Sequence, residues 1–157
     1  MTGFGHILED LNEAGVRYVL IGGIALIRHG VVRATRDIDA VFDPAADNVE
    51  RIRSLASQWA ATRPDGSPIP EGSILPERSI HLRTEKGDLD LVSEKAAGLR
   101  FDGLLSRAEV KKVDGVEAPI CSLLDLVTMK RSVGRERDLA DLADLEAAHG
   151  ELPEAGE

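Results

Sequence analysis

The stretch IGGIALIRHGVVRATRDIDAVFD, residues 21–43, places a glycine pair a short distance before an Asp-Ile-Asp triplet in otherwise largely apolar sequence. The segment VRYVLI, residues 16–21, is rich in β-branched residues and predicts a strand. Gly22 and Gly23 then turn the chain into a brief helix over IALIRHG, which Gly30 ends. The sequence therefore predicts a strand, a turn and a helix, followed by a second strand that carries two acids.

The two acids of this second strand share one face. In RDIDAVFD, Ile38, Ala40 and Phe42 alternate with Asp37 and Asp39, so both carboxylates point away from these apolar side chains. Residues two apart on a strand have Cα atoms about 6.5–7 Å apart, and two carboxylates at that spacing repel each other. A divalent cation would remove the repulsion, and Mg²⁺, or Mn²⁺ in its place, prefers such oxygen ligands.

A second acidic stretch lies downstream, in SIHLRT-EKG-DLDLVS over residues 79–93, which predicts a hairpin. Its GDLDLV segment supplies Asp88 and Asp90, again on one face of a strand, and either residue is a candidate third carboxylate. Three carboxylates can hold a pair of metal ions that activate an attacking oxygen and stabilise a leaving one.

The glycine pair indicates that the metal would bind together with a phosphate group. A glycine turn at a helix start exposes backbone N–H groups that can bind phosphate. Thr35 and the cations Arg33 and Arg36 lie between this turn and the acidic pair. A glycine turn, cations and a carboxylate pair within about twenty residues suit a metal–triphosphate ligand.

Each of these motifs also has a structural interpretation without a ligand. A glycine pair can simply supply a turn, and an acidic pair can be neutralised by Arg33 and Arg36. Asp88 and Asp90 can form the solvated face of a hairpin strand. An exposed helix lysine such as Lys130 is a common surface cation.

The histidines and the last acidic run are interpreted structurally. His29 precedes a glycine that ends a helix, so we expect it to cap or pack, and we expect His81 to be a polar group satisfied by its neighbours. Acids at a spacing of three in ERDLADLADLEAAH favour a solvated helix face, formed by Asp138, Asp141 and Asp144.

The rest of the chain completes a mixed α/β (α+β) domain over residues 1–150, with a mixed sheet flanked by helices and a C-terminal helical segment. An acidic, flexible tail is expected over 151–157. Residues 62–77 are rich in Pro and Gly, and we expect a loop or lid-like excursion there, whose closure over a substrate is a hypothesis that the sequence leaves open. Periodicity and turn signals predict helices over 3–14 and 45–61, a hairpin around Asp114-Gly115, a helix capped by Ser122 and a final helix over 136–149.

Composition excludes several classes of protein. With 28 acidic and 19 basic residues the net charge is −9, which disfavours non-specific binding to long nucleic acid. The single cysteine, Cys121, lies in apolar sequence and predicts a buried thiol. The N-terminal residues do not resemble a signal peptide, and the longest apolar run is too short for a membrane span. We therefore expect a soluble, cytoplasmic protein that does not bind membranes.

The glycine pair, followed by RATRDIDAVFD, resembles the signature of the polymerase-β-like nucleotidyltransferase superfamily. The form GGIALIRHG followed by R-A-T-R-D-I-D is similar to the small bacterial branch of abortive-infection and toxin–antitoxin nucleotidyltransferases. IHLRTEKGDLDLV falls where that family has its third acidic strand, and APICSLLDLVTMKRSVGRERDLADLADLEA resembles its C-terminal helices, so the resemblance spans about residues 5–148. It implies Mg²⁺-dependent transfer of an NMP from an NTP to an acceptor hydroxyl on a tRNA, a protein or a small molecule. It also implies a cognate antitoxin protein as a partner.

The resemblance also assigns roles to individual residues. Asp37 and Asp39 would hold the metal, and Asp90 would be the third catalytic and metal-binding acid, with Asp88 as the fallback. Asp138 and Asp141 resemble a structural or substrate-side acidic pair. The residues assigned to nucleotide binding are Gly22, Gly23, Thr35, Arg36 and Lys130.

Two residues depart from the family pattern. Ile24 follows the glycine pair where most members have a small polar residue, which removes one donor to phosphate. Arg36 could pair with an acid and occupy the site. The alternative interpretation is therefore a weakly active or inactive nucleotide-binding or antitoxin-like module of the same fold. Metal-dependent glycosyltransferases also use Asp-X-Asp, but they normally require a larger chain.

Overall fold

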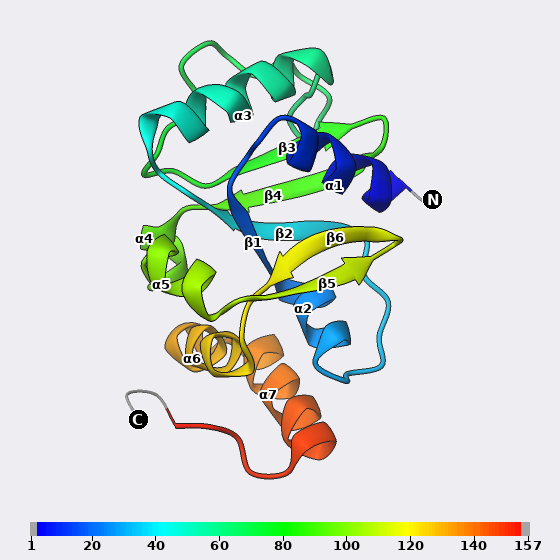
Figure 1. The fold of residues 1–157 in the computed structure, drawn as a ribbon, viewed down its shortest axis with the longest axis vertical. Helices are drawn as coiled ribbons and strands as arrows, with labels where there is room; N and C mark the ends of the chain where they lie inside the picture. The colour runs from blue at the N-terminus through cyan, green and yellow to red at the C-terminus, as the bar shows by residue number, and fades with distance from the viewer. Residues whose placement is uncertain (1–2, 155–157) are drawn as a thin grey trace.

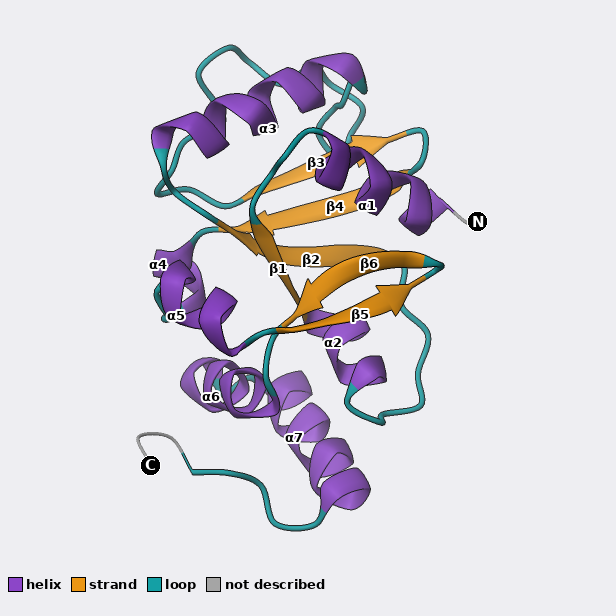
Figure 2. Ribbon diagram, viewed as in Figure 1, coloured by secondary structure: helices purple, strands orange, loops and turns teal. Residues whose placement is uncertain are grey.

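In the computed structural model, which describes residues 3–154, one mixed sheet carries helices on both of its faces (Figures 1 and 2). This arrangement confirms the predicted mixed α/β fold. The helices are α1 (Gly3–Glu13), α2 (Gly22–Arg28), α3 (Ala46–Gln58), α4 (Glu94–Ala97), α5 (Phe101–Arg107), α6 (Leu123–Val133) and α7 (Glu136–His149). The strands are β1 (Tyr18–Ile21), β2 (Asp37–Phe42), β3 (Ile80–Thr84), β4 (Gly87–Val92), β5 (Glu109–Val113) and β6 (Val116–Ile120).

The sheet has the strand order β3-β4-β2-β1-β6-β5. β2 runs parallel to β4, and β1 runs parallel to β6, whereas the other neighbouring strands are antiparallel. The strand with the acidic pair, β2, thus lies inside the sheet between β1 and β4. Its apolar residues Ile38, Ala40 and Phe42 are at most 1% exposed, so they fix which face the two acids occupy.

The helices form two layers around the sheet. α1 and α3 cover one face, while α2, α6 and α7 lie on the other, with α4 and α5 near one end of the sheet (Figure 1). α1 buries Ile7, Leu8 and Leu11 at helical spacing, as its sequence pattern predicts. The α6–α7 pair is the predicted C-terminal helical segment, and it closes the layer on the side of α2.

The strongest local sequence signals are confirmed. Asp114 and Gly115 both adopt positive φ, 50° and 80°, as a tight hairpin turn between β5 and β6 requires. Ser122 caps α6, because its hydroxyl accepts a hydrogen bond from the backbone N–H of Asp125. Cys121 is buried, and that burial raises the pKa of its thiol to about 12.

Two features differ from the sequence analysis. The short helices α4 and α5 lie in a segment where we predicted no helix, since neither is long enough to give a clear periodicity. The 62–77 loop begins with a β-bridge, because Thr62 pairs with both Pro68 and Arg83. The start of that loop is therefore attached to β3.

The C-terminal residues that the structure describes pack against α6. Leu152 is 9% exposed, and Arg131 donates a hydrogen bond to the carbonyl of Pro153. Residues 155–157 of the expected tail lie outside the described part of the chain. Within residues 3–154, no helix has the length and apolar character needed to cross a bilayer.

Candidate active site

The glycine pair stands where β1 passes directly into α2. Gly22 has φ +64°, and a Cβ atom at this position would lie 2.2 Å from Asp39 Oδ2. A Cβ atom at Gly23 would lie 2.6 Å from the Thr35 hydroxyl. Both glycines are therefore required sterically, because the acidic strand and its preceding loop approach the β1–α2 turn this closely.

The four acids form two rows across the central strands. The parallel register of β2 and β4 places Asp37 opposite Asp88 and Asp39 opposite Asp90. Directly opposed residues share a face of the sheet, so the sequence-predicted carboxylates of the two strands do meet.

The edge strand β3 adds a basic residue to each row. His81 is registered with Asp90, and Arg83 is registered with Asp88. The His81 Nδ1 atom lies 2.5 Å from Asp90 Oδ1, and the Arg83 Nε atom lies 3.4 Å from Asp88 Oδ1. His81 Nε2 is 3.2 Å from Asp88 Oδ2 but is buried and not aligned for a hydrogen bond. His81 thus lies between two carboxylates. The prediction that its neighbours satisfy this polar group is correct for Nδ1, which is hydrogen-bonded, but not for Nε2.

The acids of the two rows differ in their charge environment. Burial raises the pKa of Asp39 to about 7, together with its contact to Asp90 and the nearby charge of Asp37, while Lys130 opposes the shift. Burial also opposes ionisation of Asp88, but Arg83 and His81 outweigh it and hold its pKa below the usual value. The Asp39 row is therefore the one in which burial and a neighbouring acid disfavour ionisation of a carboxyl group.

A cavity of about 520 Å³ lies beside that row, a size suited to a small ligand. Asp37, Asp39 and Asp90 line it together with Gly22 and Gly23, whereas Asp88 does not. Leu126, Met129 and Val133 of α6 form part of an apolar wall. The cations that line the cavity are Arg33, Lys130, Arg135 and Arg137.

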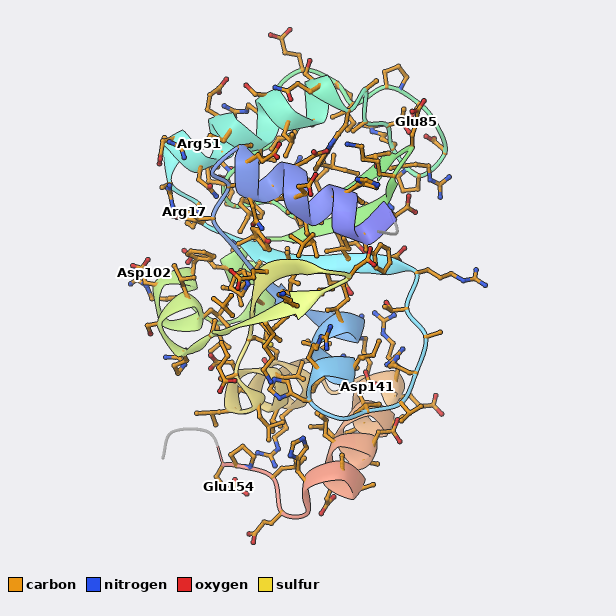
Figure 3. All side chains as sticks on the ribbon, turned by 45° about the vertical axis from the view of Figure 1, so that its right-hand side comes forward. Arg17, Arg51, Glu85, Asp102, Asp141 and Glu154 are labelled. Carbon is orange, nitrogen blue, oxygen red and sulfur yellow. The ribbon has the colours of Figure 1, made fainter. Side chains whose placement is uncertain are left out.

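Lys130 lines the cavity but is held by two acids of α7. Its Nζ atom is 2.8 Å from Asp141 Oδ2 and 3.4 Å from Asp138 Oδ1. Arg33 also pairs with Asp141, at 2.9 Å, and Arg135 pairs with Asp138, at 2.8 Å. Figure 3 labels Asp141 on the side of α7 that faces α2 and the connection to β2.

This ion-pair network corrects the prediction of a solvated face on the last helix. Asp138 is 1% exposed and Asp141 is 8% exposed, and only Asp144 is exposed as predicted. Sequence spacing shows which residues share a helix face but not what covers that face, and here α6 and the Arg33 loop cover it.

Thr35 and Arg36 are the two predicted nucleotide-binding residues that do not line the cavity. The Thr35 hydroxyl donates to the backbone carbonyl of Asp37 and packs against Gly23. The Arg36 side chain is exposed and forms no ion pair within the described residues, so it does not occupy the acidic site. Arg33 pairs with Asp141 rather than with Asp37 or Asp39.

The donor set suits a hard divalent cation, although it is not assembled around one point. Carboxylate oxygens are preferred Mg²⁺ ligands, and a cation would relieve the repulsion that raises the pKa of Asp39. Within residues 3–154, however, no three His, Cys, Asp or Glu side chains converge as a ready ligand group. A site in which all three carboxylates bind one cation would therefore require side-chain rotations at Asp37, Asp39 or Asp90.

Comparison with known families identifies the class of the protein. Residues 6–148 match the model of a family described as a nucleotidyltransferase of unknown function, DUF6036. The chain belongs to this nucleotidyltransferase family. The resemblance of the chain to nucleotidyltransferases is thereby confirmed.

Solved structures of nucleotidyltransferases share the fold. The lincosamide antibiotic adenylyltransferase LnuA, solved with lincomycin bound, aligns with a TM-score of 0.62 over 93% of this chain and 96% of its own, at 16% identity. The antibiotic-resistance factor ANT(2'')-Ia aligns at 0.61 over 94% and 83%, with 11% identity. A nucleotidyltransferase-like antigen from Paracoccidioides brasiliensis aligns at 0.58 over 92% and 72%, with 18% identity. Among curated proteins, none matches the chain.

His81 is the residue of this nucleotidyltransferase that sequence analysis underestimated. A signal for it existed, because a two-residue turn between Thr84 and Gly87 fixes the β3–β4 register and so places residue 81 opposite residue 90. No sequence pattern indicated that Arg135 and Arg137 line the cavity, because their positions depend on how α7 packs.

Proposed function

We propose that this nucleotidyltransferase transfers an NMP group from an NTP to an acceptor hydroxyl in a Mg²⁺-dependent reaction. The supporting observation is that Asp37, Asp39 and Asp90 line one cavity beside the Gly22–Gly23 turn. Three carboxylates in one cavity are costly for folding, and a metal–triphosphate ligand would offset that cost.

Each residue then has a defined task. Asp37 and Asp39, with Asp90 as the third ligand, would hold Mg²⁺, which when bound neutralises charge on the phosphates. Asp90 accepts the proton of the acceptor hydroxyl as its oxygen bonds to the α-phosphorus, while the bond from that phosphorus to the pyrophosphate oxygen breaks. Arg33, Arg135 and Arg137 lie along the same cavity, but Arg33 and Arg135 are already paired with Asp141 and Asp138, so it is mainly the charge of Arg137 that would favour the departing pyrophosphate. Lys130 would contribute there only by sharing its charge with Asp138 and Asp141.

For the acceptor we propose a small hydroxyl-bearing molecule. The net charge of −9 disfavours extended contact with nucleic acid, and the structurally similar LnuA and ANT(2'')-Ia were solved with lincomycin and with adenylyl-2''-tobramycin. A tRNA end or a protein hydroxyl, as in toxin-type relatives with an antitoxin partner, would be the other acceptor classes.

A label-transfer assay tests this function. The protein is incubated with Mg²⁺ and each α-labelled NTP, with separate pools of small hydroxylated compounds, RNA and protein as acceptors. We expect transfer to the small-molecule pool, loss of transfer after Asp37→Ala or on addition of EDTA, and normal transfer with Asp144→Ala, an exposed acid outside the cavity. Transfer only to RNA or protein would replace the proposed acceptor. Transfer that survives Asp37→Ala would contradict the assigned site.

A second candidate function is a nucleotide-binding module without transferase activity. It is favoured by Lys130, which is ion-paired to two acids, and by Ile24 in place of a small polar residue after the glycine pair. This candidate predicts tight NTP binding with no transfer to any of the three acceptor pools.

A further inference from the structure

His81 occupies the end of a row of side chains that crosses three strands. The registers place His81 on β3 opposite Asp90 on β4, and Asp90 opposite Asp39 on β2. All three residues line the cavity. Asp90 therefore has a base on one side and another carboxylate on the other.

The hydrogen bond from His81 restrains a carboxyl group that would otherwise be free to turn. A carboxylate can only accept, so the Nδ1 atom of His81 must carry the hydrogen in the 2.5 Å contact to Asp90 Oδ1. Without that bond, repulsion from Asp39, which lies directly opposite on β2, would favour rotation of the Asp90 side chain away from it. The bond uses one of the two oxygens of Asp90.

The other edge of the His81 ring lies close to Asp88, without a hydrogen bond. Its Nε2 atom faces Asp88 at 3.2 Å, and Asp88 is itself paired with Arg83. Arg83, Asp88 and His81 thus form a chain of charged and polar contacts along the β3–β4 hairpin that ends on Asp90. This chain gives Asp88 a task other than metal binding, consistent with its position outside the cavity lining.

We propose that His81 is a positioning residue, which fixes the carboxyl group of Asp90 in the orientation needed for metal and acceptor, a role that rests on the function proposed above. The proposal concerns the Nδ1 hydrogen bond alone. It predicts that any side chain that places an N–H donor at this point preserves the orientation of Asp90.

The test measures Mn²⁺ affinity of the full chain by electron paramagnetic resonance, in the presence of α,β-methylene-ATP. His81→Phe keeps a planar ring without the donor, and His81→Asn places an amide N–H near the position of Nδ1. We expect His81→Phe to weaken Mn²⁺ binding about 10-fold or more, and His81→Asn to remain within about 3-fold of the wild type, since partners of ligating side chains typically contribute about 10–100-fold. His6→Phe, at an exposed position of α1, is the matched control and should bind as the wild type does.

Asp90→Asn separates failure of this inference from failure of the proposed function. If Asp90→Asn weakens Mn²⁺ binding but His81→Phe does not, the role of His81 is overturned while the metal site stands. If neither variant changes binding, both are overturned. Weakening by His81→Phe that His81→Asn does not restore would show that the ring matters for packing and would overturn the hydrogen-bond proposal. Thermal unfolding checks that each variant is folded, and His81→Leu replaces His81→Phe if the latter is not.

Discussion

Gly22 allows the backbone of the β1–α2 turn to lie close to Asp39 on the acidic strand β2. Its φ of +64° is unfavourable for other residues, and a Cβ atom there would meet the Asp39 carboxyl group at 2.2 Å. We predict that Gly22→Ala lowers the free energy of unfolding by about 2 kcal/mol or more, from backbone strain plus displacement of Asp39. It should also abolish nucleotidyl transfer. Urea denaturation and the label-transfer assay measure the two effects.

Gly115, in the β5–β6 turn, provides the matched control for this substitution. Its φ is +80°, but no atom lies within 4 Å of a Cβ built there. Gly115→Ala should therefore show only the strain of about 1–2 kcal/mol and keep full activity. Equal activity of the Gly22→Ala and Gly115→Ala proteins would contradict the close approach of Asp39 to the glycine turn.

Ionisation of Asp39 lowers the free energy of unfolding, so the stability of the protein depends on pH. Because its pKa is raised from 3.8 to about 7, the folded state binds the proton more tightly than the unfolded chain does. The resulting stabilisation is complete below pH 3.8 and is lost as the pH rises through about 7. We predict that, without metal, Asp39→Asn raises the free energy of unfolding at pH 8 by about 1–3 kcal/mol, since it removes a buried charge beside Asp90.

The measurement is urea denaturation of both proteins between pH 4 and 8 in the presence of EDTA. The difference between them should grow with pH, and Asp144→Asn, at an exposed acid of α7, should show no such trend. A wild-type protein more stable than Asp39→Asn at pH 8 would indicate that Asp39 is neutralised by a partner inside the protein.

At the scale of elements, the α6–α7 pair depends on a buried cluster of charges. Lys130 on α6 contacts Asp138 and Asp141 on α7, and both acids are less than 9% exposed. We predict that Lys130→Met lowers the free energy of unfolding by about 3 kcal/mol, the lower end for removal of one partner from a buried pair. The lower end applies because Arg33 and Arg135 continue to compensate the two acids. Chemical denaturation measures the loss.

Lys111→Met is the control for this element. Lys111 lies on the edge strand β5, is half exposed, and has only a 3.7 Å contact to Glu109, so its removal should change stability by less than about 1 kcal/mol. If Lys130→Met is as stable as Lys111→Met, the α7 acids are neutralised without Lys130, and this residue is then free to bind triphosphate.

At the scale of the whole molecule, the features that could be predicted from the sequence are those that local residue patterns and strand register determine. The alternation of RDIDAVFD and GDLDLV placed four acids on one face of the sheet, and parallel pairing of β2 with β4 brings them together. The turn at Asp114-Gly115 and the Ser122 cap are likewise local signals that the structure confirms.

What could not be predicted depends on how distant elements dock. The burial of Asp138 and Asp141 follows from the packing of α7 against α6 and the Arg33 loop, and no local pattern encodes that contact. The exclusion of Asp88 from the cavity follows from its pairing with Arg83 and His81 on the edge strand. The helices α4 and α5 are too short to give a periodicity, although α4 does carry local cap signals in Ser93 and Gly98.

Ligand binding should stabilise the whole molecule, because the carboxylates that weaken the metal-free fold would be neutralised on binding. A ligand at 100 times its Kd adds about 2.7 kcal/mol to the free energy of unfolding, which for a chain of this length corresponds to about 5–10 °C in Tm. We predict a rise of that size with Mg²⁺ and α,β-methylene-ATP together at pH 8, measured by differential scanning fluorimetry. EDTA should reverse it and Asp37→Asn should abolish it, because the metal then loses a ligand, whereas Asp144→Asn should retain it. An equal rise in Tm with the nucleotide in EDTA would mean that the cations along the cavity bind the triphosphate without metal. Asp37, Asp39 and Asp90 would then not be metal ligands, and the folded protein would have to tolerate their mutual repulsion.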